Sequence, residues 1–229
     1  GANTDEISQA IQTYSELAIP GVDVSGLYIH DNTFTHLNAG SSGYEGIYIN
    51  RDAGSGIIQI ENNQFSGNLL RGITSERSNT RISGNSLITN LSPGLPGGYE
   101  GISIRDASTG GPEAQSNIDI FSNTIKGSIE GNRFMRGIRV GIAGQSLTAI
   151  NILYNTIEGN TNGINVKSSA NFVVVNQNKI LGSIEKNIKN EDVNPMNAMN
   201  NWWGFTTDAQ ISNLISGNVS YTPWAYNSS

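Results

Sequence analysis

The sequence predicts an all-β protein: a solenoid of parallel strands with about six rungs, closed by a helix at its N-terminal end and by a Trp-rich segment at its C-terminal end. Three observations predict it. An eight-residue pattern occurs six times, a second strand-like segment follows the well-formed copies, and the spacers are rich in Gly, Ser and Pro. Repeats this short bury their apolar side chains only against their neighbours, as in stacked solenoids.

The recurring pattern is apolar-x-apolar-x-x-Asn-x-apolar. Its copies are LYIHDNTF (27–34), IQIENNQF (58–65), IDIFSNTI (118–125), INILYNTI (150–157) and VVVNQNKI (173–180), and a sixth copy, TRISGNSL (80–87), has Thr80 in the first apolar place. Alternation of apolar and polar residues indicates a strand rather than a helix. The Asn residues are spaced by 31, 22, 38, 32 and 23 positions, and the longer spacings contain LSPGLPGG (91–98) and STGGPEAQS (108–116). We therefore expect these insertions to form loops.

The Asn of each copy predicts a stacked column. Its members are Asn32, Asn63, Asn85, Asn123, Asn155 and Asn178. We expect the backbone to enter the left-handed region at each turn, where Asn is tolerated, and the side chains to stack at about 4.8 Å. Each side-chain amide can then donate to the next one. The column is predicted to be structural.

A second segment places charges in register. It reads EGIYI (45–49), RGITS (71–75), EGISI (100–104), RGIRV (136–140) and NGINV (162–166). In a stack, Glu45, Arg71, Glu100 and Arg136 alternate in sign along an exposed face, where each pair contributes a few tenths to about 1 kcal/mol. The Ile column beneath it is predicted to fill the core: Ile47, Ile73, Ile102, Ile138 and Ile164.

Together these repeats resemble the right-handed parallel β-helix family, the pectate-lyase-like fold, over residues 23–198. NNWWGFTTD (200–208) and VSYTPW (219–224) resemble terminal segments of bacterial extracellular β-helix proteins. The resemblance implies one structural domain with an N-terminal cap (1–22), a parallel β-helix (23–198) and a C-terminal cap (199–229). It also implies a secreted or cell-surface location.

Both ends carry apolar segments that can cover a terminal rung. Residues 4–18 place apolar side chains at helical spacing after Thr4, which predicts a capping helix. At the other end we expect three tryptophans to close the last rung: Trp202, Trp203 and Trp224. Capping is expected because an uncovered rung exposes unpaired strand edges.

Composition excludes several functions. Thirteen basic and nineteen acidic residues give a net charge of −6 without a basic run, so we expect no nucleic-acid partner. The chain lacks cysteine, and its two histidines, His30 and His36, fall in the first rung, so we expect no metal site. No run of eighteen apolar residues occurs, so we expect no membrane insertion.

One outward face is predicted to bind ligand. Its residues lie in or just after the second segment of successive rungs: Tyr48, Arg51, Asp52, Glu76, Arg105, Asp106, Arg139 and Lys167. Guanidinium groups suit the carboxylate of a uronic acid, so the expected partner is a polysaccharide, and an acidic one in particular. We therefore predict a non-catalytic domain for glycan binding or structural display, with no cofactor.

Two alternatives remain. The stretch INVKSSANFVVVNQNKI (164–180) is similar to the Lys-Ser stretch of alginate-lyase and chondroitinase relatives, which would make Lys167 the base of a polysaccharide lyase, with or without Ca²⁺. However, Asn162 and Asn165 stand where the acidic pair of those relatives is expected, so we do not expect catalysis. The second alternative is a segment of a larger surface assembly.

Overall fold

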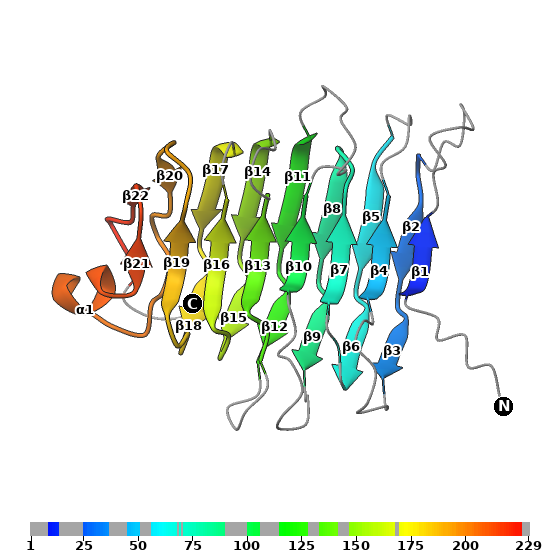
Figure 1. The fold of residues 1–229 in the computed structure, drawn as a ribbon, viewed down its shortest axis with the longest axis horizontal. Coiled ribbons are helices and arrows are strands. Elements are labelled where there is room, and N and C mark those ends of the chain that lie inside the picture. Colours follow the sequence, from blue (N-terminus) through cyan, green and yellow to red (C-terminus); the bar gives the residue numbers. More distant parts are fainter. Residues whose placement is uncertain are drawn as a thin grey trace, which may run out of the picture.

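The chain is a coil of three parallel sheets, called A, B and C here, in the computed structural model (Figure 1). Every strand pairing in the described residues is parallel. The structure describes residues 9–13, 25–36, 45–50, 56–67, 69, 71–89, 100–105, 115–127, 133–141, 147–167 and 170–225.

Sheets A and B each contain eight strands in the described residues, and sheet C contains six. Sheet A consists of β1 Gln9–Thr13, β4 Glu45–Ile49, β7 Arg71–Ser75, β10 Glu100–Ile104, β13 Arg136–Val140, β16 Asn162–Val166, β19 Lys186–Asn190 and β21 Ile215–Ser216. Sheet B consists of β2 Tyr28–His30, β5 Ile58–Glu61, β8 Thr80–Ser83, β11 Gln115–Phe121, β14 Leu147–Leu153, β17 Ala170–Asn176, β20 Met196–Asn197 and β22 Val219–Ser220. Sheet C consists of β3 Thr33–His36, β6 Gln64–Gly67, β9 Ser86–Thr89, β12 Thr124–Lys126, β15 Thr156–Glu158 and β18 Lys179–Leu181.

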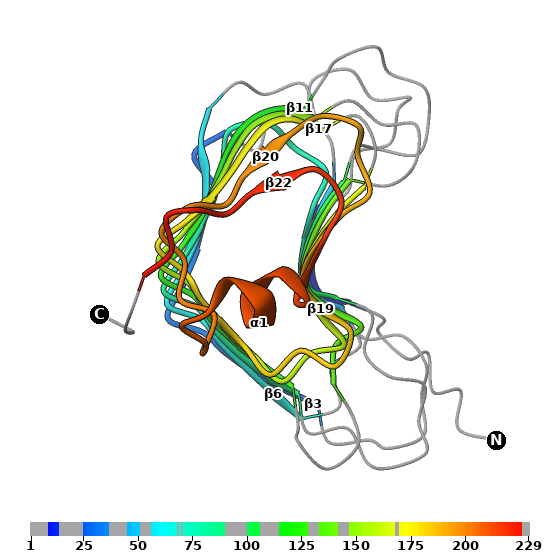
Figure 2. The same ribbon diagram turned by 90° about the vertical axis from the view of Figure 1, so that its left-hand side faces the viewer.

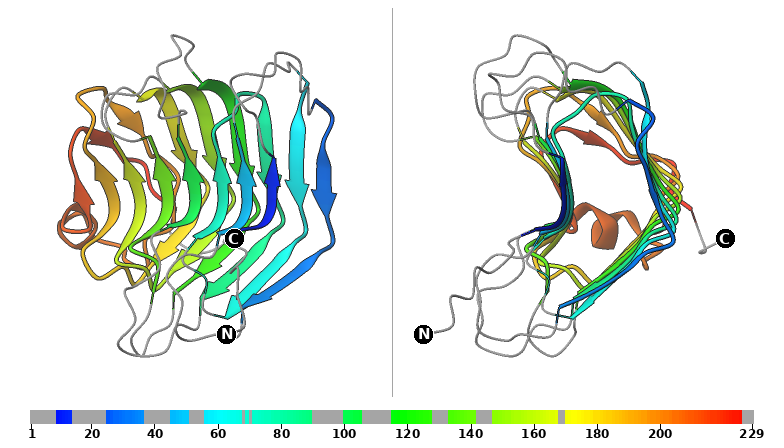
Figure 3. Two further views of the ribbon diagram at one scale, coloured as in Figure 1. Left: turned by 45° about the vertical axis from the view of Figure 1, so that its right-hand side comes forward. Right: turned by 90° about the vertical axis from the view of Figure 1, so that its right-hand side faces the viewer.

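Each complete rung takes one strand from sheet B, then one from C, then one from A. Six such rungs run from β2 to β19, as the repeat count predicts. Strand β1 extends sheet A at the N-terminal end, and β20, β21 and β22 add a partial turn at the C-terminal end. Figure 2 and the right-hand view of Figure 3 look along this stack and show the rungs superimposed around a common interior.

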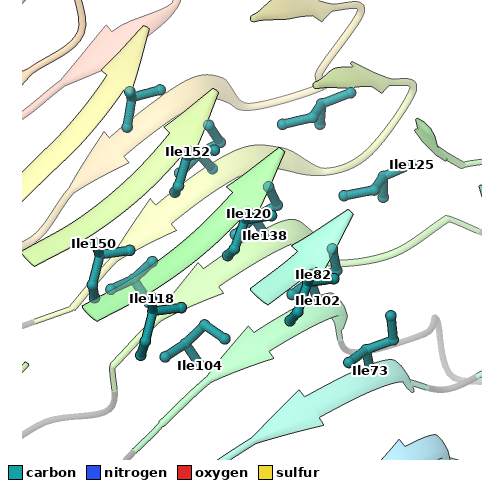
Figure 4. Packing of buried hydrophobic residues seen from close by; sticks show 14 of the residues in the cluster. Ile73, Ile82, Ile102, Ile104, Ile118, Ile120, Ile125, Ile138, Ile150 and Ile152 are labelled. Atoms are coloured by element: carbon teal, nitrogen blue, oxygen red, sulfur yellow. The ribbon is translucent and has the colours of Figure 1, made fainter. Parts of the chain in front are cut away.

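Isoleucine fills that interior in columns. The five predicted Ile residues of sheet A are fully buried, and they face Ile side chains of sheets B and C (Figure 4). In sheet C the column continues from Phe34 and Phe65, whose rings stack with their centroids 4.7 Å apart, to Leu87 and then Ile125. Stacking of like side chains at equal heights lets one packing arrangement repeat along the coil.

The predicted amide ladder is confirmed. The side-chain Nδ2 of each Asn donates to Oδ1 of the next at 2.9–3.0 Å, from Asn32 through all six predicted members. Asn178 then donates to a seventh member, Asn201, at 3.0 Å. Each of these Oδ1 atoms also accepts the backbone N–H of the preceding Asn, as Asn123 Oδ1 does from Asn85 at 3.0 Å. The ladder thus links both the side chains and the backbones of successive rungs.

The left-handed backbone falls one residue earlier than predicted. The residue before each ladder Asn has φ between 55° and 65°, and these residues are Asp31, Asn62, Gly84, Ser122, Tyr154, Gln177 and Asn200. The ladder Asn residues are not among the residues with positive φ. The bend between sheets B and C is therefore made by the preceding residue, and the amide is selected for hydrogen bonding rather than for its backbone conformation.

The N-terminal helix prediction is wrong for residues 9–13, which form β1. Ile11 pairs with Ile47 of β4 and packs against the core, whereas Ala10 is exposed. The backbone groups along the open edge of β4 need partners, and a parallel strand supplies them where a helix cannot. The rest of the predicted helix, residues 4–8 and 14–18, lies outside the described residues.

A helix instead covers the other end. Helix α1 Asp208–Ser212 lies across the C-terminal end of the coil and buries Ile211 in the core cluster (Figure 2). Trp203 is only 1% exposed, and Trp224 packs half-buried against the core, so the predicted closing of the last rung is confirmed for these two. Trp202 is half-buried, and its backbone extends sheet C by bridging Lys179.

Replacing a ladder amide with a carboxylate should destabilise the fold. Asn123 Nδ2 donates to Asn155 Oδ1, Ile82 O and Phe121 O at 2.9–3.1 Å, and an Asp at this buried position would face all three oxygens with another oxygen. We expect Asn123→Asp to lower the free energy of unfolding by about 2–4 kcal/mol in urea denaturation. Asn62→Asp at an exposed neighbouring turn is the control and should change it by less than about 0.5 kcal/mol. Equal effects would remove the ladder as a source of stability.

A bend residue that tolerates the left-handed region should stabilise the coil. Gln177 is exposed with φ 59°, a conformation in which Asn is less strained than other side chains. We expect Gln177→Asn to raise the free energy of unfolding by about 0.5–1 kcal/mol. The same substitution at Gln64, an exposed residue of strand β6, should not stabilise. A destabilised Gln177→Asn would contradict this explanation of the bend.

Candidate functional site

The outward face of sheet A carries charges in register on neighbouring strands. Glu45 pairs with Arg71, Arg71 with Glu100, and Glu100 with Arg136 in the strand alignment. The Arg71 guanidinium contacts Glu45 Oε1 at 2.6 Å and Glu100 Oε2 at 2.9 Å, and Arg136 Nη1 lies 3.1 Å from Glu100 Oε1. The predicted alternation of charge is therefore confirmed.

Glycine follows each of these charged residues for a steric reason. A Cβ at Gly101 would lie 2.7 Å from both the carbonyl oxygen of Gly137 and Cγ2 of Ile125 in sheet C. The same clash would occur one rung later, between Gly137 and Ile157. Only glycine lets the chain enter sheet A this close to the side chains of sheet C. The repeated charge-Gly-Ile sequence is thus one structural unit.

The two carboxylates of this alternating column are buried, contrary to the exposed face that the sequence predicted. Glu45 is 6% exposed and Glu100 only 1%. Hydrogen bonds to both carboxylates outweigh the effect of burial and raise the pKa of Arg71 above its ordinary value. Breaking a buried ion pair leaves an uncompensated charge and costs several kcal/mol, so these contacts matter more to folding than surface pairs do.

Tyr48, Glu76 and Arg105 form a second group on the same face. The Tyr48 hydroxyl donates to Glu76 Oε1 at 2.6 Å, and Arg105 Nε lies 3.0 Å from the same oxygen. The Arg105 guanidinium also stacks on the Tyr48 ring, 5.1 Å from its centroid, and its Nη2 lies 4.0 Å from Glu45. Burial and the hydrogen bond to Glu76 raise the pKa of Tyr48 to about 12, against the opposing effect of Arg105.

A third group lies over strands β16 and β19. Glu191 accepts ion pairs from Lys167 at 2.9 Å and Lys189 at 3.1 Å, and Asn165 Nδ2 donates to it at 3.0 Å. Burial alone would raise the pKa of Glu191, but the hydrogen bonds from Lys167, Asn165 and Lys189 lower it to about 2. Asn165 connects this group to the first one, because its Oδ1 accepts from Arg136 Nε at 3.1 Å.

These three groups form one connected set, which we call the sheet A network. Its members are Glu45, Tyr48, Arg71, Glu76, Glu100, Arg105, Arg136, Arg139, Asn165, Lys167, Lys189 and Glu191. It contains six cations and four carboxylates, and therefore an excess of two positive charges. The whole chain has a net charge of −6, so the network differs in sign from the chain as a whole.

Five of the eight predicted site residues meet in this network. They are Tyr48, Glu76, Arg105, Arg139 and Lys167, and the register places Arg105 and Arg139 on adjacent rungs, β10 and β13, as expected. Arg51, Asp52 and Asp106 lie outside the described residues.

Sequence reasoning missed Lys189 and Glu191. Lys189 lies in β19, the sixth copy of the second segment, in which Asn187 replaces the repeated glycine, and Glu191 directly follows this strand. The remaining signal was the number of residues between the ladder residue Asn178 and the start of this segment. That number is close to the one between Asn155 and the segment of the preceding rung.

Among the described residues, no cluster of three or more His, Asp or Glu side chains could hold a metal ion. No helix in that part of the chain is long and apolar enough to cross a membrane.

Comparison with known families supports the fold. The family described as a right-handed beta helix region matches residues 19–202. The chain belongs to this family, and its coil is therefore a right-handed parallel β-helix. Searches of curated proteins and of solved structures gave no match.

The ion pairs of Glu191 with Lys167 and Lys189 should make stability depend on pH in a defined window. The pKa of Glu191 is lowered from an ordinary value of 4.5 to about 2, so the stabilising contribution of this carboxylate is present above pH 4.5 and is lost as the pH falls towards 2. We expect Glu191→Gln to be less stable than the wild type at pH 6, and this difference to shrink by pH 2. Urea midpoints at the two pH values measure it. An equal difference at both would contradict the assigned role.

Proposed function

We propose that the outer face of sheet A binds a linear acidic polysaccharide without cleaving it. The observation that carries this proposal is the positive excess of the sheet A network in an acidic chain. Its guanidinium groups are only partly covered, so they can reach a ligand while their carboxylate partners hold them in place. Such a role suits a protein that is secreted or displayed at a cell surface.

The geometry favours a ligand that runs along the coil axis. Arg105, Arg139 and Lys167 belong to three successive rungs, and parallel strands are spaced by about 4.8 Å. An extended polymer with repeated carboxylates can therefore meet a cation at each rung. Tyr48 lies on β4, two rungs before Arg105, and its ring adds an apolar surface to the same face.

Two features favour binding over cleavage. A pKa of about 12 keeps the Tyr48 hydroxyl protonated at neutral pH, where it cannot act as a base. The Lys167 ammonium, the candidate base of a lyase, is held in an ion pair with Glu191 at 2.9 Å. Both groups are thus already engaged with carboxylates of the sheet A network.

Affinity electrophoresis tests the proposal. Polygalacturonate or alginate in the gel should retard the wild type, a neutral glucan should not, and added salt should weaken the retardation. The double variant Arg105→Gln, Arg139→Gln keeps a polar partner for Glu76 and Glu100 and should bind roughly tenfold more weakly.

A matched control removes two cations from another face. Lys126→Gln with Lys179→Gln removes the two lysines that pair with Glu158 on sheet C, and it should leave retardation unchanged. Equal retardation in acidic and neutral gels, or equal loss in both double variants, would overturn the proposal. Release of an unsaturated product absorbing in the ultraviolet would instead establish a lyase.

A further inference from the structure

Strand β13 presents two guanidinium groups to a single carboxylate oxygen. Arg136 Nη1 and Arg139 Nη1 lie 3.1 and 2.9 Å from Glu100 Oε1. The other oxygen, Oε2, is 2.9 Å from Arg71 Nε. One buried carboxylate is therefore opposed by three guanidinium groups, and among the described residues only Arg71 of these has a second carboxylate partner, Glu45. Positive charge is in excess at β13.

Both guanidinium groups are fixed at a second nitrogen. Arg136 Nε donates to Asn165 Oδ1, and Arg139 Nε donates to the Gly141 carbonyl oxygen, each at 3.1 Å. Gly141 has φ 77°, a conformation that glycine adopts without strain. Two contacts to a planar group fix its orientation, so little conformational entropy remains to be lost when a ligand binds.

The third nitrogen of each group is unused. Within the part of the chain that the structure describes, Nη2 of Arg136 and Nη2 of Arg139 make no hydrogen bond. The two side chains are 20% and 19% exposed, so they reach solvent from a largely desolvated setting. Two oriented donors that carry uncompensated charge form a site for an anion.

We propose that Arg136 and Arg139 form an anion subsite that takes one carboxylate or sulfate ester group of a bound sugar. This inference rests on the proposed function and assigns Arg136, which the sequence placed only in a structural column, a direct role in binding. Arg71 differs because it bridges Glu45 and Glu100. The subsite therefore belongs to β13 and not to every arginine of the face.

Nuclear magnetic resonance can observe the subsite without a polymer. The Nε–H groups of Arg136 and Arg139 are hydrogen-bonded in the folded protein and should give resolved signals. Galacturonate and galactose 6-sulfate should shift these signals in a saturable way, whereas galactose should not. The sugar that saturates at the lower concentration identifies the preferred anionic group.

Lysine variants separate charge from geometry. Arg136→Lys and Arg139→Lys keep a cation beside Glu100 but remove the oriented Nη2 donor, and each should raise the dissociation constant for the anionic sugar roughly tenfold. Arg71 contacts the other oxygen of Glu100, so Arg71→Lys should change the dissociation constant by less than about twofold. Thermal unfolding of all three verifies that they fold.

The outcomes separate the subsite from the proposed function. Saturable shifts in the wild type that are lost in the β13 variants support the subsite even if no polysaccharide retards the protein, and that combination overturns only the polysaccharide proposal. The subsite itself is overturned if galactose shifts the signals as much as galacturonate does. It is equally overturned if neither anionic sugar shifts them, or if Arg71→Lys weakens binding as much as the β13 variants do.

Discussion

The amide ladder sets the register on which every other column depends. Seven asparagines link successive rungs through both side-chain and backbone bonds, at one fixed position of each rung. Side chains in a strand alternate between faces, so a slip of one residue would turn the Ile columns outward and the charges of sheet A inward. The ladder lies at the corner between sheets B and C, and sheet A follows after one further strand and a turn. The insertions within one rung (91–98) and between two rungs (108–114) both fall between Asn85 and Asn123, which still bond to each other, so insertions of different length do not disturb the register.

Sheet A shows what a fixed register makes possible. Charged residues can be buried there because each finds its partner on the next strand, as Glu100 does with Arg71 and Arg136. A buried ion pair contributes little net stability but strongly disfavours arrangements in which one partner is missing. The network thus discriminates against misaligned rungs, while the isoleucine columns supply most of the favourable burial. Stability and specificity come from opposite faces of the same strands.

The sequence predicted the features that repeat along the chain, but not those that depend on tertiary contacts between rungs. The ladder, the Ile columns and the alternating charges follow from spacing, because equal positions in successive repeats must stack. Burial of Glu45 and Glu100 could not be predicted in this way, since it depends on how side chains of several rungs cover the face. The helix expected at residues 4–18 failed where β4 offered an unpaired edge to β1, a tertiary contact that local periodicity does not contain. Glu191 was missed because Asn187 interrupts the glycine pattern that marks the segment.

The demands of folding and those of the proposed binding both involve Glu100. Its burial requires cations, and the register supplies one from each neighbouring strand, Arg71 on β7 and Arg136 on β13. Those two already contact both oxygens of the carboxylate, yet Arg139 adds a third guanidinium to Oε1. One carboxylate cannot neutralise three cations, even with Glu45 sharing Arg71. The excess positive charge therefore lies where the fold already orients the guanidinium groups. The anion of the proposed ligand would neutralise this charge.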